Sequence, residues 1–163
     1  MGTALHARGI AFEACFDELN LTRPTLVAEI HRAYVEAGAR IIEANTFGAN
    51  RYKLAAHGLE RRAREINTAG VEIARGVAER ASSRVLIAAS VGPLGVRLAP
   101  FGRVAPKEAQ QAFQEQIGAL VEAGADLIVI ETHGDLTHEW SLAAVPITAR
   151  AEDKGQPLLG QRA

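Results

Sequence analysis

The chain carries one pattern twice, as VEAGARIIEANTFG at Val35–Gly48 and as VEAGADLIVIETHG at Val121–Gly134. In each copy a helix with an apolar face leads to a glycine, Gly38 or Gly124, which favours the left-handed conformation that ends a helix. A short apolar, β-branched run follows, and then polar residues. Helix, tight turn, buried strand and polar tip make half of a βαβ unit. The repeat therefore predicts a parallel sheet or barrel in which strands and helices alternate.

Polar side chains end the strand in both copies. Superposing the copies places Asn45 opposite Glu131 and Thr46 opposite Thr132. In α/β sheets and barrels the active site lies at the carboxyl ends of the strands. These positions are therefore the first candidates for functional residues.

Apolar patterning divides the rest of the chain into further strands and helices. The expected strands cover residues 40–46, 85–91 and 126–132, and the expected helices begin near Pro24, Leu59 and Pro106. A helical stretch from Asp135 follows, and the run PLLGQ at Pro157–Gln161 is compatible with a fourth strand. Strands separated by helices pair in parallel through right-handed crossovers.

Composition and charge exclude several classes of protein. The 163 residues are 48% hydrophobic and only 5% aromatic, which is typical of one α/β domain packed from small aliphatic side chains. The 18 basic and 19 acidic residues are mixed along the chain, so no basic face favours nucleic acid or an anionic membrane. No apolar run approaches the roughly 18 residues of a membrane span, and the opening MGTALHARGI has no signal-peptide core. A cytoplasmic protein is expected.

Glu131 is the most informative single position. It follows four apolar residues, so its carboxylate is partly desolvated unless a cation or a hydrogen-bond donor meets it. The amino group of a ligand would meet that need, and so would a structural arginine; the sequence leaves both open. Asn45 is a similar but weaker candidate, and Glu43, on the same side of its strand, fits a polar network inside a barrel.

Other polar groups favour structural explanations. The loop SVGPLG at Ser90–Gly95 lacks the spacing and the Lys-Ser/Thr pair of a phosphate-binding loop, so a tight turn is expected. His133 and His138 do not have the four-residue spacing of a zinc pair on a helix. Cys15 is the single cysteine and has no basic neighbour in the sequence to lower its pKa, which indicates an inert thiol.

Four segments together resemble a known family. They are CFDELNLTRP at Cys15–Pro24, EAGARIIEANTFGANRYKL at Glu36–Leu54, SVGPLG at Ser90–Gly95 and DLIVIET at Asp126–Thr132. In order and spacing they resemble the homocysteine S-methyltransferase domain, most of all bacterial proteins in which it is joined to a methylenetetrahydrofolate reductase. The resemblance implies a (β/α)8 barrel and methyl transfer to the thiol of homocysteine, as in methionine biosynthesis.

The resemblance also implies a zinc cofactor. Because a free thiol is mostly protonated at neutral pH, coordination to zinc is what supplies the attacking thiolate. Family members hold the metal with three cysteines, in an Asn-Cys-Gly type and a Gly-Gly-Cys-Cys type motif. Neither motif occurs in this sequence, so neither a metal ligand nor a catalytic residue is assigned here.

By position, the resemblance carries over only the homocysteine-binding side. Gly2 and Thr3 match the end of the family's first-strand loop, and Asn45 and Thr46 match its Thr-Asn-Thr-Phe segment. Glu131 matches the strand-end glutamate that receives the ammonium group of the amino acid. Ser90 and Gly92 line the strand between them and complete the expected substrate-binding set.

The sequence departs from the family at both ends. It begins within the first-strand loop, has His133 where the family usually has Phe, and loses the likeness after Leu136. One domain over 1–163 is therefore expected, family-like over 1–135 with a divergent tail at 136–163. Because a complete barrel needs about 250 residues, a partial (β/α)8 barrel is expected.

These observations lead to one main expectation and two alternatives. The main expectation is a truncated homocysteine S-methyltransferase, inactive by itself, with part of the amino-acid pocket. The methyl donor stays open among folate, cobalamin and methylsulfonium types, and self-association is expected because an open barrel exposes strand edges. The alternatives are a non-catalytic assembly module and a phosphate-handling barrel enzyme.

Overall fold

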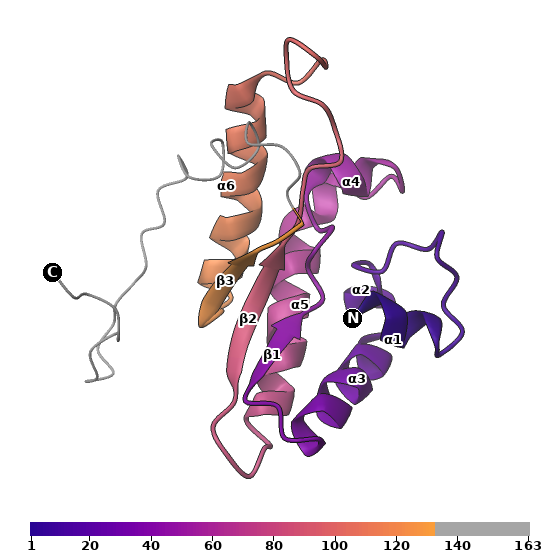
Figure 1. Ribbon diagram of the computed structural model, residues 1–163, viewed down its shortest axis with the longest axis vertical. Coiled ribbons are helices and arrows are strands. Elements are labelled where there is room, and N and C mark those ends of the chain that lie inside the picture. Colours follow the sequence, from indigo (N-terminus) through magenta and orange to yellow (C-terminus); the bar gives the residue numbers. More distant parts are fainter. Residues whose placement is uncertain (133–163) are drawn as a thin grey trace, which may run out of the picture.

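The computed structural model describes residues 1–132, which form a parallel sheet flanked by helices (Figure 1). The strands are β1 (Ile41–Ala44), β2 (Leu86–Val91) and β3 (Leu127–Ile130), hydrogen-bonded in the order β1-β2-β3. The helices are α1 (Gly2–His6), α2 (Leu19–Thr22), α3 (Pro24–Glu36), α4 (Arg51–Ala55), the 3-10 helix η1 (Glu60–Arg62), α5 (Ala63–Ala78) and α6 (Pro106–Glu122). Parallel strands alternating with helices confirm the predicted α/β class.

Both copies of the repeated pattern end their helix in the same way. Gly38 after α3 and Gly124 after α6 have φ angles of 99° and 87°. The next amide, of Ala39 or Ala125, donates to the carbonyl five positions earlier, at 3.0 and 3.1 Å. This pairing is the Schellman motif, where glycine avoids the steric cost of a Cβ in the left-handed region. It turns the chain sharply from each helix into the following strand.

The regular strands are shorter than the predicted ranges 40–46, 85–91 and 126–132. Pairing nevertheless continues past their ends, because Leu86 N donates to Arg40 O at 2.9 Å and Glu131 N donates to Val91 O at 3.2 Å. At the end of β1 the amide of Thr46 turns back to Ala44 O at 2.9 Å, which terminates the ladder.

The loop predicted for Gly2 and Thr3 is instead the first turn of α1. Helical geometry here turns Leu5 into a fully buried position, where it packs with Val27 and Ile30 of α3. Burying such a side chain contributes about 1.5–3 kcal/mol, which outweighs the weak preference of the preceding residues for a loop. The stretch from Asp135 and the run at Pro157–Gln161 lie outside the described residues.

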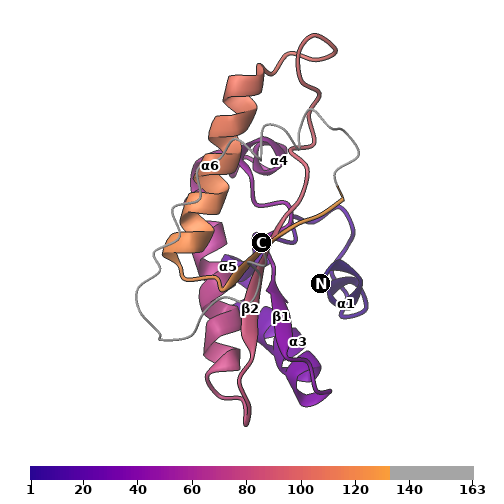
Figure 2. The same cartoon turned by 60° about the vertical axis from the view of Figure 1, so that its left-hand side comes forward.

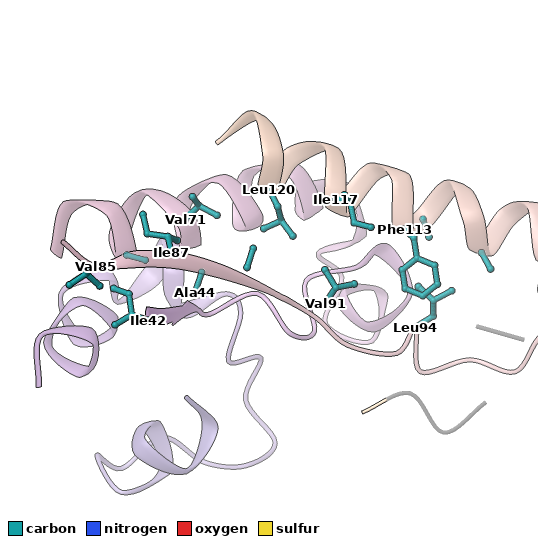
Figure 3. Close-up of a cluster of buried hydrophobic side chains, with 14 of the residues drawn as sticks. Ile42, Ala44, Val71, Val85, Ile87, Val91, Leu94, Phe113, Ile117 and Leu120 are labelled. Atoms are coloured by element: carbon teal, nitrogen blue, oxygen red, sulfur yellow. The ribbon is translucent and has the colours of Figure 1, made fainter. Parts of the chain in front are cut away.

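The main core lies between the sheet and the helices α5 and α6, which cover the same face of the strands (Figures 2 and 3). It is formed by Ile42, Ala44, Ile87, Ala89 and Val91 from the strands and by Val71, Ala74, Phe113, Ile117 and Leu120 from the helices. No helix within residues 1–132 is long and apolar enough to span a membrane.

Because successive strand residues point to opposite faces, the alternate residues lie on the other side of the sheet. We call this side the inner face; along the strands it carries Ile41, Glu43, Ala88, Ser90, Leu127 and Val129. Ile41 and Leu127 are 52% and 41% exposed there. The polar residues after β1 and β3 continue this face at the carboxyl edge of the sheet.

Candidate functional site

A serine and a glutamate from neighbouring strands meet at the carboxyl edge of the inner face. The Ser90 hydroxyl, at the end of β2, donates a hydrogen bond to Oε1 of Glu131, directly after β3. Ser90 is only 2% exposed, whereas Glu131 is partly open to solvent. None of the ion pairs formed within residues 1–132 involves Glu131. The carboxylate is therefore oriented by the protein while its charge stays available to a cationic ligand.

Glu131 and Glu43 together make the inner face negative. The pKa of Glu43 is raised, first because it is partly desolvated and second because Glu131 adds a negative charge; the amino-terminal ammonium opposes both effects. Two carboxylates on one side of a sheet favour a positively charged ligand group.

Asn45 lies beside Ser90 at the end of β1, but its amide group is engaged by the protein. Its Nδ2 donates to Phe16 O at 2.6 Å and to Asn20 Oδ1 at 3.1 Å. In return Asn20 Nδ2 donates to Asn45 O at 2.7 Å. The Asn45 side chain thus ties the end of β1 to the segment that leads into α2.

Thr46 is completely buried and its hydroxyl is also engaged. The Thr46 hydroxyl donates to Ser90 O at 2.9 Å and accepts from Ser90 N at 3.1 Å. Behind it, Gln116 of α6 donates from Nε2 to Thr46 O at 2.8 Å. Thr46 therefore contacts the backbone of Ser90 rather than open space.

Gly92 and the loop after it are packed rather than open. The Gly92 amide donates to Phe47 O at 3.0 Å, and a Cβ on Gly92 would lie 2.5 Å from the Phe47 ring. This amide is therefore occupied and does not donate to a phosphate. After β2 the chain is irregular over residues 92–94 and bends at Gly95 and Val96, so the expected tight turn directly after the strand stays a prediction.

Gly2 and Thr3 differ in their relation to the other predicted residues. A Cβ on Gly2 would lie 3.1 Å from the Phe16 ring, and the carbonyl of Phe16 accepts from Asn45, so Gly2 is linked to the strand ends through Phe16. Thr3 is exposed on α1, where its carbonyl accepts from Ala7 N. Within residues 1–132, Thr3 makes no hydrogen bond to Asn45, Ser90 or Glu131.

Three buried carboxamides that the sequence analysis did not single out hold the segment after β1. Asn20, Asn67 and Gln116, from α2, α5 and α6, donate to the carbonyls of Asn45, Ala49 and Thr46 at 2.7–2.8 Å. Gln116 lies within the apolar stripe of α6, between Phe113 and Leu120. A polar side chain in an otherwise apolar stripe is the sequence signal that could have identified it, since buried polar groups need partners.

A pocket of about 470 Å³ opens beside this segment, next to the carboxyl ends of β1 and β2. Its polar lining includes Asp17, Lys53 and His57, and Lys53 Nζ lies 4.3 Å from the centre of the Phe47 ring. Burial raises the pKa of Asp17 to about 6, against the opposing effects of the Gly48 amide, which donates to it at 3.0 Å, and of Lys53. Asp17 was missed because nothing near it in sequence indicates burial.

The described residues do not fit the zinc site that the resemblance implies. Within residues 1–132 no group of three or more His, Cys, Asp or Glu side chains is placed to hold a metal ion. Burial is the main reason that the pKa of the Cys15 thiol is raised, which disfavours the thiolate that zinc would need. His133 and His138 lie outside the described residues.

The chain matches the family model described as homocysteine S-methyltransferase over residues 1–156. This match continues beyond the residues whose motifs carry the resemblance. Methionine synthase of Mycobacterium tuberculosis is 36% identical over 145 residues, which are 83% of this chain and 12% of that protein. Methionine synthase of Mycobacterium leprae is 35% identical over 127 residues, 76% of this chain and 10% of that protein.

Solved structures of the homocysteine methyltransferase MmuM from Escherichia coli have the same fold. The oxidized and the metallated forms each match with a TM-score of 0.75 and 28% identity over 89% of this chain. The chain covers 55% and 56% of those two structures. It therefore spans about half the length of these methyltransferases and roughly a tenth of the length of the methionine synthases.

Proposed function

Since this chain belongs to the homocysteine S-methyltransferase family, we propose that its inner face binds the amino-acid end of homocysteine during methyl transfer to the thiol, the reaction that forms methionine. The observation that carries the proposal is the partly exposed carboxylate of Glu131, oriented by Ser90 and without an ion-pair partner within residues 1–132.

An ammonium group would give the Glu131 carboxylate the ion-pair partner that it lacks within residues 1–132. Glu131 is fixed at the end of a strand, so it presents its charge in one direction, and Glu43 adds negative charge to the same face. Charge-assisted hydrogen bonds between an ammonium group and a carboxylate are about twice as strong as neutral ones. We assign Glu131 to the ammonium group of homocysteine, with Ser90 as the residue that orients it.

Residues 1–132 bind and orient the substrate in this proposal, and they do not activate its thiol. Their donor groups do not fit zinc, so we assign them no step at the sulfur atom. We also assign no methyl donor, since nothing in the described residues distinguishes a folate, a cobalamin or a methylsulfonium compound.

Calorimetric titration of the full chain with homocysteine tests the proposal. The matched probe is γ-mercaptobutyrate, which is homocysteine without its amino group. Glu131→Gln should weaken homocysteine binding by about tenfold or more, as expected for a lost bond to a charged group, and should leave γ-mercaptobutyrate unchanged. Glu122→Gln, at an exposed carboxylate of α6, is the control. If the wild-type chain does not bind homocysteine, the proposal is wrong.

A non-catalytic assembly module is the second candidate, and the exposed inner-face side chains Ile41 and Leu127 favour it. Apolar side chains on a sheet face are normally covered by another layer. This candidate predicts a chain that associates through the inner face and has no affinity for homocysteine, so the same titration separates the two.

A further inference from the structure

We propose that Thr46 is a positioning residue, which holds Ser90 so that the Ser90 hydroxyl orients the carboxylate of Glu131. The inference deepens the proposed function: it moves Thr46 from direct contact with the substrate to support of the group that contacts it. It rests on the contacts of Thr46, Ser90 and Glu131 in the structure.

The hydroxyl of Thr46 is not available to a ligand, because its proton is used and the side chain is buried. It donates its single proton to Ser90 O and accepts from Ser90 N, and Thr46 has no exposed surface. These two hydrogen bonds hold both the backbone carbonyl and the backbone amide of Ser90 in β2. The backbone sets the direction of the Cα–Cβ bond of Ser90, so a fixed backbone restricts the positions from which its hydroxyl can reach Glu131.

Thr46 is itself held from two further sides. Gln116 of α6 binds its carbonyl at 2.8 Å. On α5, Gly70 lies so close that a Cβ there would be 2.8 Å from Cγ2 of Thr46. Helices α5 and α6 therefore fix Thr46, Thr46 fixes Ser90, and Ser90 orients Glu131. Such supporting contacts are what keep a binding group within a fraction of an ångström of its working geometry.

The side-chain chemistry specifies threonine or serine at this position. A short hydroxyl side chain can both donate to one backbone group and accept from another, whereas a valine of the same shape can do neither. Thr46→Val thus removes the two bonds with little change of volume, and Thr46→Ser restores them. Thr22→Val is a matched control, because the Thr22 hydroxyl donates to Glu18 O on an exposed surface.

The test reads Glu131 directly, by carbon NMR of its carboxyl group in the full chain without ligand. Ser90→Ala should shift this resonance because the hydrogen bond is lost. Thr46→Val should shift it in the same direction, and Thr46→Ser and Thr22→Val should leave it in place. If Thr46→Val leaves the Glu131 resonance at its wild-type position, or if Ser90→Ala does so, the inference is overturned. Circular dichroism checks that the valine variant folds. If it does not fold, Thr46→Ala is used in its place.

Binding provides the second readout. Thr46→Val should weaken the binding of homocysteine by about tenfold and leave the affinity for γ-mercaptobutyrate unchanged, since only the ammonium group depends on Glu131. Equal weakening of both ligands would indicate general damage and would contradict a positioning role. A wild-type chain that does not bind homocysteine refutes the proposed function, whereas the resonance of Glu131 still decides the role of Thr46.

Discussion

Glu43 of β1 and Glu131 after β3 lie on the same face of the sheet, and the charge of Glu131 raises the pKa of Glu43. Burial is the first cause of the raised pKa of Glu43, and the negative charge of Glu131 is the second. The inner face thus holds two like charges that a bound cation would relieve.

Glu131→Gln should lower the pKa of Glu43, because the substitution removes a neighbouring negative charge and keeps the shape of the side chain. Titration of the Glu43 carboxyl group by NMR measures the change. Glu122→Gln, at a carboxylate paired with Arg64 on the surface, should have no effect. An unchanged pKa of Glu43 in the Glu131 variant would mean that the two carboxylates do not share a face.

The two glycines of α5 should respond in opposite ways to alanine. At Gly70 a Cβ would lie 2.7 Å from Asn20 Nδ2 and 2.8 Å from Thr46 Cγ2, both in the buried support of the site. Gly70→Ala should therefore destabilise the chain by about 1–3 kcal/mol, as overpacking does. At Gly76 the nearest atom is the flexible end of Arg80 at 3.8 Å, so Gly76→Ala should stabilise it by about 0.5–1 kcal/mol. Thermal unfolding of both variants is the measurement, and destabilisation of similar size in both would count against this packing.

The fold was largely predictable from the sequence, because helix and strand differ in the spacing of their apolar residues. Gly38 and Gly124 marked the two helix ends, and the helix expected to begin near Pro106 is α6. The first residues were not predictable in this way. The helix at Gly2 depends on the burial of Leu5 against α3, a contact that local pattern does not encode.

The site was predictable only in its outline. The resemblance implied Ser90 as a site residue, and the rule that the carboxyl ends of parallel strands meet at one edge predicts that it lies near Glu131, as it does. Which polar groups face outward could not be predicted. The carbonyl of Phe16 occupies the amide of Asn45, and the backbone of Ser90 occupies the hydroxyl of Thr46. Both are tertiary contacts between residues far apart in the chain.

Two titratable groups, the partly buried Asp17 and the buried His31, should oppose each other in the pH dependence of stability. Burial raises the pKa of Asp17 from 3.8 to about 6, so between these values the folded state holds more protons at Asp17 than the unfolded state. This lowers stability as the pH rises. Burial, and next the amino-terminal ammonium, lower the pKa of His31 from 6.5 to about 4, which raises stability as the pH rises over that interval.

Asp17→Asn should therefore reveal the contribution of His31, with a Tm that rises more steeply between about pH 4 and 6.5 than in the wild type. The asparagine Oδ1 can still accept from the Gly48 amide, so the loop contact is kept. His31→Gln should have the opposite effect, a Tm that falls over the same interval. Circular dichroism melts across this range test both, and parallel curves for the two variants would show that neither group is buried as described.

The last prediction concerns the inner face as a contact surface. Ile41 and Leu127 are exposed on it, and among residues 1–132 no strand pairs with the outer edge of β1 or of β3. Open edges and exposed apolar side chains favour pairing with another chain. We therefore expect self-association that increases with concentration in sedimentation velocity experiments.

The double variant Ile41→Lys with Leu127→Lys should shift the population toward monomer, because each lysine places a charge on the contact surface. Phe101→Lys is the control, since Phe101 is 87% exposed but lies in the loop before α6. A wild-type chain that stays monomeric at every concentration and unfolds in one sharp transition would show that the inner face is already covered within the chain.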